Sequence, residues 1–336
     1  MSSVHGWIIL DKPLGLGSTQ GVSAVKRALR AGGYGKLKVG HGGTLDPLAT
    51  GVLPIAIGEA TKLAGRMLDS DKVYDFTIRF GVQTDTLDLE GAEIARSDVR
   101  PTLAELEAVL PHFTGPIEQV PPAYSALKVD GQRAYDLARA GEEVVLASRA
   151  VTIHALNSSP AREGGPSEGW WKGGSADGTL GEAPLHHSPE EANGPPPRAG
   201  EELEEATLTA HVSKGTYIRS LARDIALALG TVGHVTMLRR IKAGPFTLAD
   251  SISLDKLDEL GHGRALEDKL LPLRAGLDDI PALSLTPDQA GLLRQGRVLI
   301  GTAADDGLHF AISDDVPVAL VEVLDREVRV VRGFNL

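Results

Sequence analysis

Residues 40–51 read Gly-His-Gly-Gly-Thr-Leu-Asp-Pro-Leu-Ala-Thr-Gly, a run with four glycines and one proline around a single carboxylate. Glycine has a high entropic cost in regular elements and proline lacks a backbone donor, so the run predicts a fixed loop rather than helix or strand. The apolar residues after Leu45 indicate that this loop lies on a core. Asp46 is then a carboxylate held by rigid backbone, with glycines that allow close approach, and this pattern is typical of a site.

The pattern leaves a plainer alternative open. Asp before Pro is a common turn initiator, and its side chain often caps its own backbone. A glycine-rich loop can also cradle phosphate, but no Gly-Lys-Ser/Thr follows at the required spacing and no Gly-x-Gly-x-x-Gly opens a helix. A nucleotide-binding loop is therefore not expected.

Composition restricts the class of protein. The 336 residues, 42% of them hydrophobic, are enough for two domains or one large domain with an appendage. The absence of cysteine excludes a disulfide framework, a thiolate nucleophile and a cysteine-based zinc site. The run at 7–10 is too short for a signal peptide, and no apolar run reaches membrane-spanning length. We expect a soluble cytoplasmic protein that does not contact a membrane.

The net charge of −11 argues against a nucleic-acid partner, but its distribution reverses that conclusion. Residues 1–72 hold nine basic and five acidic side chains, and residues 206–249 hold six and one. The acidic side chains are concentrated elsewhere: residues 157–205 hold ten acidic and three basic side chains. Because salt screens charge over about 8 Å, an anionic partner is allowed if both basic blocks face it.

Hydrophobic periodicity predicts the order of the elements. A buried strand is expected at 6–11, followed by a helix from Ser18, its N-cap, through Ala31. The clearest strand is 73–81, with the side chains of Tyr74, Phe76, Ile78 and Phe80 on one face. Further helices are expected near 60–69, 102–112, 133–140 and 218–229, and strands near 149–156, 206–213 and 238–242.

The composition of the second half of the chain predicts an insertion, a linker and a small separate unit. Residues 157–205 are rich in Gly, Pro, Ser and Glu, which is typical of a disordered insertion. The strands before and after it alternate well and could pair as a hairpin, because loop closure becomes only slowly costlier with length. We expect one domain at 1–250, a linker at 251–280, and a small β-rich unit at 281–336 with a helix near 287–295.

Several segments together resemble one family. Residues 40–51 look like the catalytic motif of the TruB-type tRNA pseudouridine synthases, and Lys-Gly-Thr-Tyr-Ile-Arg at 214–219 is a second specific match. Supporting matches occur in family order at 10–13, 58–62, 72–74, 124–128 and 238–240. The tail is similar to the small PUA RNA-binding barrel that many members carry.

The resemblance implies an isomerase that converts one uridine of the tRNA T loop, position 55, to pseudouridine without cofactor or metal. It implies an α/β (α+β) fold: a mixed, mainly antiparallel sheet followed by a PUA-like barrel. The partner would be the T arm of tRNA, with no obligate protein partner, and we expect a monomer. Two features depart from the family: the insertion, and an acidic Asp75 beside Tyr74 where the neighbourhood is usually more basic.

Site residues carry over position by position. Asp46 would be the catalytic carboxylate, acting as nucleophile or base, Arg219 would pair with it, and Tyr74 would stack on the target base. The residues expected to line the substrate site are His41, Tyr217 and Leu238. The basic side chains expected to contact the RNA backbone are Lys12, Lys62, Lys214, Arg239 and Arg240. No metal is expected at His41, because no carboxylate or His lies at ligand spacing beside it.

The chemistry suits a single carboxylate. Isomerisation breaks the N1–C1′ bond, turns the base and re-forms the link through C5, with no redox change and no added water. Asp46 could attack C1′ or C6, or remove a proton at C2′, and the sequence does not choose among these. A nearby arginine would keep the carboxylate ionised.

Two alternatives belong to other classes. One is a non-catalytic RNA-binding or RNA-folding module in which Asp46 has no chemical role. The other is a serine acyl-transfer hydrolase, since residues 125–128 match Ser-x-x-Lys and Lys214-Gly215-Thr216 superficially matches Lys-Thr-Gly. The order of Gly and Thr is wrong for it, and an extended segment would place Ser125 and Lys128 on opposite faces.

Overall fold

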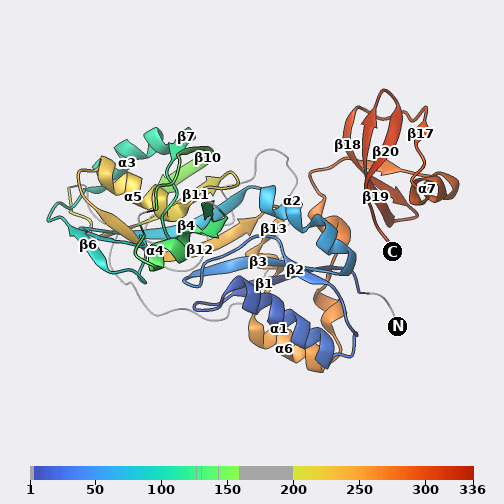
Figure 1. Ribbon diagram of the computed structural model, residues 1–336, viewed down its shortest axis with the longest axis horizontal. Coiled ribbons are helices and arrows are strands. Elements are labelled where there is room, and N and C mark those ends of the chain that lie inside the picture. The colour runs from blue at the N-terminus through green and yellow to red at the C-terminus, as the bar shows by residue number, and fades with distance from the viewer. Residues whose placement is uncertain (1–3, 126, 130, 143, 159–199) are drawn as a thin grey trace.

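A large mixed sheet forms the body of the computed structural model, which describes residues 4–125, 127–129, 131–142, 144–158 and 200–336 (Figure 1). Its strands follow the order β14-β1-β3-β12-β4-β11-β10-β7, with short strands β2, β13 and β15 beside this path. The neighbours are antiparallel except β1 with β14 and β3 with β12, which are parallel. The strands are β1 (Gly6–Lys12), β2 (Val39–His41), β3 (Ala49–Ile57), β4 (Lys72–Phe80), β7 (Gly115–Gln119), β10 (Arg149–Ser158), β11 (Glu205–Val212), β12 (Gly233–Ala243), β13 (Phe246–Thr247), β14 (Ser251–Ile252) and β15 (Leu271–Pro272).

Two apolar clusters cover the two halves of this sheet. Helices α1 (Ser18–Ala31) and α6 (Leu254–His262) pack together beside β1 and β3, around Val25, Leu53 and Leu257. Helices α3 (Leu103–Val109) and α5 (Ile218–Ala228) pack on the half made of β4, β10, β11 and β12. Further short elements are helices α2 (Ala64–Asp69) and α4 (Ala134–Arg139) and the pairs β5 (Val82–Thr84) with β6 (Glu93–Arg96) and β8 (Lys128–Val129) with β9 (Gln132–Arg133).

The predicted elements are largely confirmed, and one cap is wrong. Strand β4 buries Phe76, Ile78 and Phe80 on the expected face. Helix α1 has the expected bounds, but its N-cap is Gly17. The Ser18 hydroxyl is used elsewhere, because it binds the backbone of Leu45. The predicted loop is also shorter than residues 40–51, since β2 ends at His41 and β3 begins at Ala49.

The hairpin expected on either side of the low-complexity segment is confirmed, because β10 and β11 pair antiparallel. The ends of the predicted insertion are wrong. Residues 157 and 158 continue β10, and Leu203 is buried in the same cluster as α3 and α5. The backbone of Glu204 also accepts a hydrogen bond from Phe80. Residues 159–199, the rest of that prediction, lie outside the described residues.

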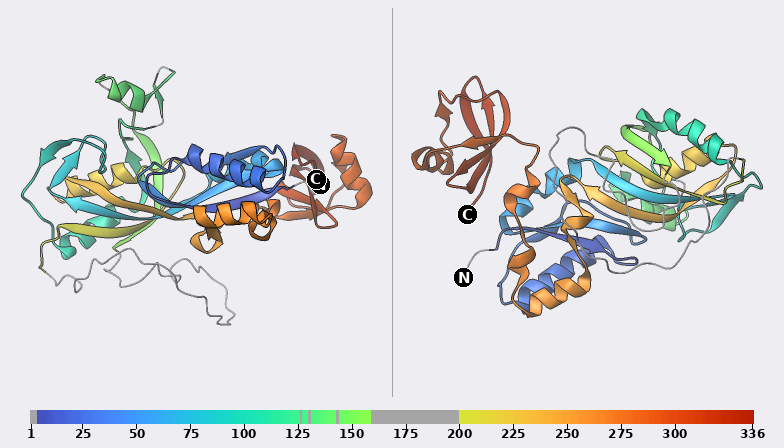
Figure 2. Two further views of the ribbon diagram at one scale, coloured as in Figure 1. Left: turned by 90° about the horizontal axis from the view of Figure 1, so that it is seen from below. Right: turned by 180° about the vertical axis from the view of Figure 1, so that it is seen from behind.

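A second, five-stranded sheet follows, in the order β16-β18-β19-β20-β17, with helix α7 (Pro287–Arg294) against it. Its strands are β16 (Ala282–Ser284), β17 (Leu299–Ile300), β18 (Gly307–Ser313), β19 (Val316–Leu324) and β20 (Glu327–Gly333). This curled sheet is the predicted PUA-like unit, and it lies at the end of the molecule away from α3 and β6 (Figures 1 and 2).

The segment 251–280, expected as a linker, contributes to the first sheet. Strands β14 and β15 pair with β1, and α6 packs on α1, where a Cβ at Gly261 would meet Ala28. The sequence signal for these elements was weak because two of the strands are only two residues long. Within the described part of the chain, no helix is both long and apolar enough to span a membrane.

Candidate active site

The loop that carries Asp46 is fixed from the side of α1. The Ser18 hydroxyl donates to the Leu45 carbonyl at 2.9 Å and accepts from the Leu45 amide at 2.8 Å. The Gly42 amide donates to the Pro54 carbonyl of β3 at 2.8 Å. All three bonds hold the main chain of the loop, so the position of Asp46 depends on the backbone of its neighbours.

Two buried cations hold the same loop from the side of the sheet. Arg240 on β12 donates from Nε to the Val52 carbonyl at 2.7 Å and from Nη1 to the Thr44 carbonyl at 3.2 Å. Lys12 donates from Nζ to the carbonyls of Leu16 and Pro47 at 2.6 and 3.2 Å. Burial lowers the pKa of Lys12 to about 8. The loop is not paired as a strand, so its carbonyls would otherwise lack hydrogen-bond donors. The side chains of Lys12 and Arg240 supply those donors.

Gly51 explains why β3 can run so close to β12. Its φ is +97°, and a Cβ there would lie 2.2 Å from the carbonyl oxygen of Arg240. Only glycine tolerates both the backbone conformation and the approach. This glycine therefore lets the strand after Asp46 pair in parallel with the strand that carries Arg240.

Asp46 forms an ion pair with Arg219, as the family resemblance implied. The Arg219 Nη2 donates to Asp46 Oδ2 at 2.9 Å, although the two residues lie 173 positions apart. The Arg219 side chain is only 8% exposed, whereas that of Asp46 is 47% exposed. A buried guanidinium thus faces a carboxylate that still has an open side for a substrate.

Asp88 completes the arrangement and was not predicted from the sequence. Its Oδ2 accepts from Arg219 Nη1 at 3.1 Å, and its Oδ1 accepts from the Glu90 amide at 3.0 Å. Arg219 also donates to the carbonyls of Thr86 and Tyr124 at 2.8 and 3.0 Å. The guanidinium therefore has a fixed orientation independent of Asp46. A single aspartate between two leucines, Leu87 and Leu89, carries no local signal for such a role.

A small pocket opens beside this ion pair. Its lining is formed by Asp46, Leu48, Ala49, Asp88, Arg219 and residues 235–238 of β12. The structure thus brings Leu238 next to Asp46 and Arg219, as expected for a substrate-lining residue. Its walls combine two carboxylates and one guanidinium with apolar side chains.

Three other predicted residues lie on nearby elements but outside the lining of that pocket. Tyr74 on β4 is half-buried against both apolar clusters and is in register with Arg240. Tyr217 precedes α5, and the Arg149 guanidinium lies 4.7 Å from its ring centre. His41 ends β2, and burial, with the charge of Arg240, lowers its pKa. In the described part of the chain its Nδ1 is buried without a hydrogen-bond partner.

The basic residues expected on the RNA backbone divide into two groups. Lys12 and Arg240 are 0% and 1% exposed, so the structure corrects that prediction: their donors hold the loop. Lys62 pairs with Glu59, Arg239 with Asp11, and Lys214 with Asp69. These three side chains are 25%, 35% and 63% exposed, so they remain accessible to an anionic partner.

Two family models match parts of the chain. Residues 27–163 match the family model "TruB family pseudouridylate synthase (N terminal domain)". Residues 219–278 match the model "tRNA pseudouridylate synthase B C-terminal domain". The first match includes Asp46 and the second begins at Arg219, so together they contain both members of the ion pair.

Similar sequences cover nearly the whole chain. A protein of Novosphingobium aromaticivorans named tRNA pseudouridine synthase B is 62% identical over 99% of this chain and 98% of its own. A protein of Zymomonas mobilis with the same name is 55% identical over 99% and 97%. Among solved structures, one titled "Crystal Structure of a Cbf5-Nop10-Gar1 Complex" covers 98% of this chain and 85% of its own. Its TM-score is 0.66 at 23% identity, which supports the fold.

Proposed function

Because the chain belongs to the TruB family of pseudouridylate synthases, and is therefore an isomerase, we propose that it converts uridine 55 in the T loop of tRNA with Asp46 as its catalytic carboxylate. The conversion of uridine to pseudouridine in tRNA follows from the family. The position in the T loop and the role of each side chain are our proposal.

The observation that carries the proposal is the contrast in exposure across the Asp46–Arg219 pair. Asp46 reaches the pocket with an open face, while Arg219 is buried and held by Asp88 and two carbonyls. The carboxylate can act on C1′, C6 or the C2′ proton while the guanidinium holds its other side in place. No redox group is required, because the base that leaves C1′ is the group that re-forms the bond through C5, and the proton lost from C5 is balanced by the one gained at N1.

Tyr74 supplies the second part of the proposal. The target uridine must leave its stack, at a cost of a few kcal/mol. Stacking on an aromatic side chain returns about 1–3 kcal/mol. Tyr74 is partly exposed on β4, next to the strand that lines the pocket, and we propose that its ring takes this role. His41 and Tyr217 would bound the same substrate site.

The wider RNA surface follows from the accessible cations. We propose that Lys62, Lys214 and Arg239 contact phosphates, with a salt-dependent affinity as the result. Residues 281–336 would form the PUA-like RNA-binding domain, after a catalytic domain that includes Asp46 and Arg219. We further propose a cytoplasmic monomer that needs no cofactor and no obligate protein partner.

The test replaces the carboxylate by its isosteric amide. We expect Asp46→Asn to abolish pseudouridine formation in an unmodified tRNA transcript while changing tRNA affinity by less than about tenfold, because electrostatic binding depends on the basic side chains. Pseudouridine is mapped at each position of the transcript, and binding is measured by filter retention. Asp258→Asn on α6, an exposed carboxylate, is the matched control and should leave both quantities unchanged.

Two outcomes would contradict the proposal in different ways. Turnover that persists in Asp46→Asn would remove its catalytic role and favour the non-catalytic RNA-binding module. Pseudouridine at another position of the transcript would leave Asp46 in place but change the target. The serine hydrolase gains no support, because Ser125 is only 4% exposed and the described residues give its hydroxyl no hydrogen-bond partner.

A further inference from the structure

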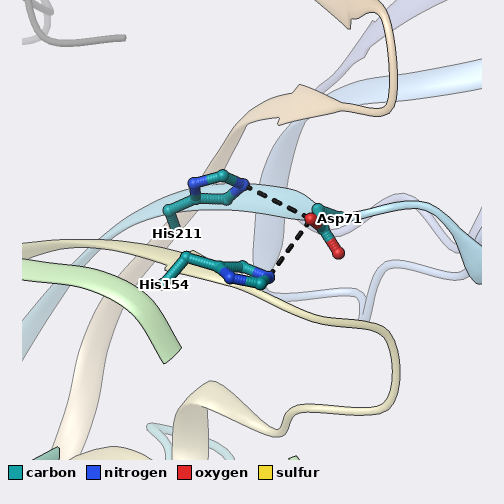
Figure 3. Close-up of side chains that lie close together, drawn as sticks. All are labelled: Asp71, His154 and His211. Carbon is teal, nitrogen blue, oxygen red and sulfur yellow. Dashed lines mark ion pairs between the residues drawn. The ribbon is translucent and has the colours of Figure 1, made fainter. Parts of the chain in front are cut away.

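Three side chains outside the pocket converge at one point of the sheet. His154 lies on β10, His211 on the neighbouring β11, and Asp71 directly before β4. Figure 3 shows both imidazole rings directed at the Asp71 carboxylate. None of the three has a role in the proposed reaction.

The distances join one oxygen to two nitrogens. The Nε2 atom of His154 lies 3.2 Å from Asp71 Oδ2, and that of His211 lies 3.8 Å from the same atom. The ring centres are 4.7 Å apart, and all three potential ligand atoms lie within 4.8 Å of one another. Two ligands of one tetrahedral zinc ion, at bonds of about 2.1 Å, are about 3.4 Å apart. The cluster therefore needs only a small contraction to surround an ion.

The backbone holds the ligands in place. The register of β10 and β11 shifts between Ile153 and Ala155, so His154 lies at an irregularity of the kind that re-aims a side chain. Ile153 is fully buried whereas His154 is exposed. The Asp71 carbonyl accepts from the Gly244 amide at 3.0 Å, which fixes the start of β4.

We propose that Asp71, His154 and His211 form a binding site for a divalent transition-metal ion, with Zn²⁺ as the preferred occupant. The ligands would be the Nε2 atom of each imidazole and one carboxylate oxygen. Side chains that are 37%, 42% and 48% exposed leave the fourth position of the ion to water.

Ligand chemistry selects the class of ion. Two nitrogen ligands and one oxygen suit zinc and its neighbours, whereas Mg²⁺ and Ca²⁺ prefer oxygen alone. Within the described residues, neither imidazole has an ion-pair partner other than Asp71. Lys242 acts on His211 by its charge, and the nearby Lys214 pairs with Asp69.

The site would connect three strands of the first sheet. An ion there would link β10 and β11 to the start of β4, the strand that carries Tyr74. Because such a site does not exist in the unfolded chain, binding would stabilise the folded state. This inference is independent of the reaction proposed for Asp46.

The experiment uses the full chain after treatment with a chelator, at pH 7.5. Calorimetric titration with zinc chloride should show an equivalent of binding that is lost or weakened by more than about tenfold in His154→Gln and in His211→Gln. Titration with cobalt chloride should give the visible absorption of a tetrahedral ion. The thermal midpoint of the wild type should rise with zinc, and that of the double variant should rise less.

Controls separate this site from other ligands and from misfolding. His112→Gln, an exposed histidine outside the cluster, should bind zinc as the wild type does. Asp71→Asn keeps both imidazoles and should weaken binding without removing it. Circular dichroism without metal should be the same for all variants. Equal zinc affinity and stoichiometry in the wild type and the double variant would overturn the proposal, as would the absence of binding to the wild type.

Discussion

The loop around Asp46 and the junction between the two sheets both depend on basic side chains, but they use them in opposite ways. At the loop, Lys12 and Arg240 are buried and bind backbone carbonyls. At the junction, Lys62 and Arg66 are about one-quarter exposed and pair with the carboxylates of Glu59 and Asp279. Among the described residues, neither Lys12 nor Arg240 has a carboxylate within ion-pair distance.

The difference shows what each region requires. A buried cation without a counter-ion is costly, so it persists only where several well-placed acceptors surround it. The loop offers such acceptors because its glycines and proline prevent regular pairing. At the junction an apolar cluster that includes Trp7, Phe310 and Phe334 joins the sheets, and the ion pairs lie at its edge. The comparison predicts that removing a cation lowers the free energy of unfolding more at the loop than at the junction.

The largest loss of stability is expected when Arg240 is replaced. Arg240→Met removes the donors to Val52, Thr44 and Gly43 and leaves their carbonyls without this partner. Unsatisfied buried acceptors cost about 1–3 kcal/mol each, so we expect the free energy of unfolding to fall by about 3 kcal/mol or more. Urea titration measures the change, and activity should fall because Asp46 depends on the same loop.

The neighbouring arginine is the control for that change. Arg239 lies on the same strand, is 35% exposed, and pairs with Asp11. Arg239→Gln should reduce the unfolding free energy by about 1 kcal/mol or less. Equal losses for the two variants would contradict the distinction between cations that hold the loop and cations that face outward.

A smaller change in stability is expected from the titration of Lys12 with pH. Burial lowers its pKa to about 8, from an ordinary value of 10.5. Between these values the unfolded chain binds a proton that the folded chain has released, so stability rises as pH increases from about 8 to 10.5. The unfolding free energy of the wild type, measured at pH 7.5 and 9.5, should therefore increase relative to that of Lys12→Met.

Lys26→Met provides the matched comparison for this titration. Lys26 is an exposed lysine on α1 and should give the same pH dependence as the wild type. Since burial also lowers the pKa of Lys72 to about 8, the wild type and both variants share that second contribution. A pH dependence for Lys12→Met that matched the wild type would show that Lys12 titrates normally in the folded chain.

The sequence predicted helices and strands better than it predicted contacts between residues far apart in the chain. Helix α1 and strand β4 were foreseen because their apolar residues repeat at the periods of helix and strand, and burial follows that repetition. The Asp46–Arg219 pair could not come from any local period, since 173 positions separate its members. It came from the resemblance of two motifs to one family. Asp88, which belongs to neither motif, was missed.

The positions of the basic side chains were also not predictable from local sequence patterns. Counting charges located two basic segments, yet it could not tell that Lys12 and Arg240 point beneath the loop while Lys214 points outward. That distinction depends on which strand lies beside β3, and parallel pairing with β12 is a long-range property. The cluster of Asp71, His154 and His211 could not be predicted for the same reason, because two strands and the residue before a third supply it.

The smallest effect is expected at the junction. Arg66 binds both oxygens of Asp279, at 3.0 and 2.8 Å, but the Asp279 side chain is 74% exposed. Arg66→Gln should therefore lower the unfolding free energy by about 1 kcal/mol or less, and the difference from the wild type should shrink in high salt. Phe334→Ala, at a side chain 2% exposed in the apolar cluster, should cost about 3 kcal/mol or more. A larger loss for Arg66→Gln than for Phe334→Ala would mean that charge, rather than apolar contact, joins the two sheets.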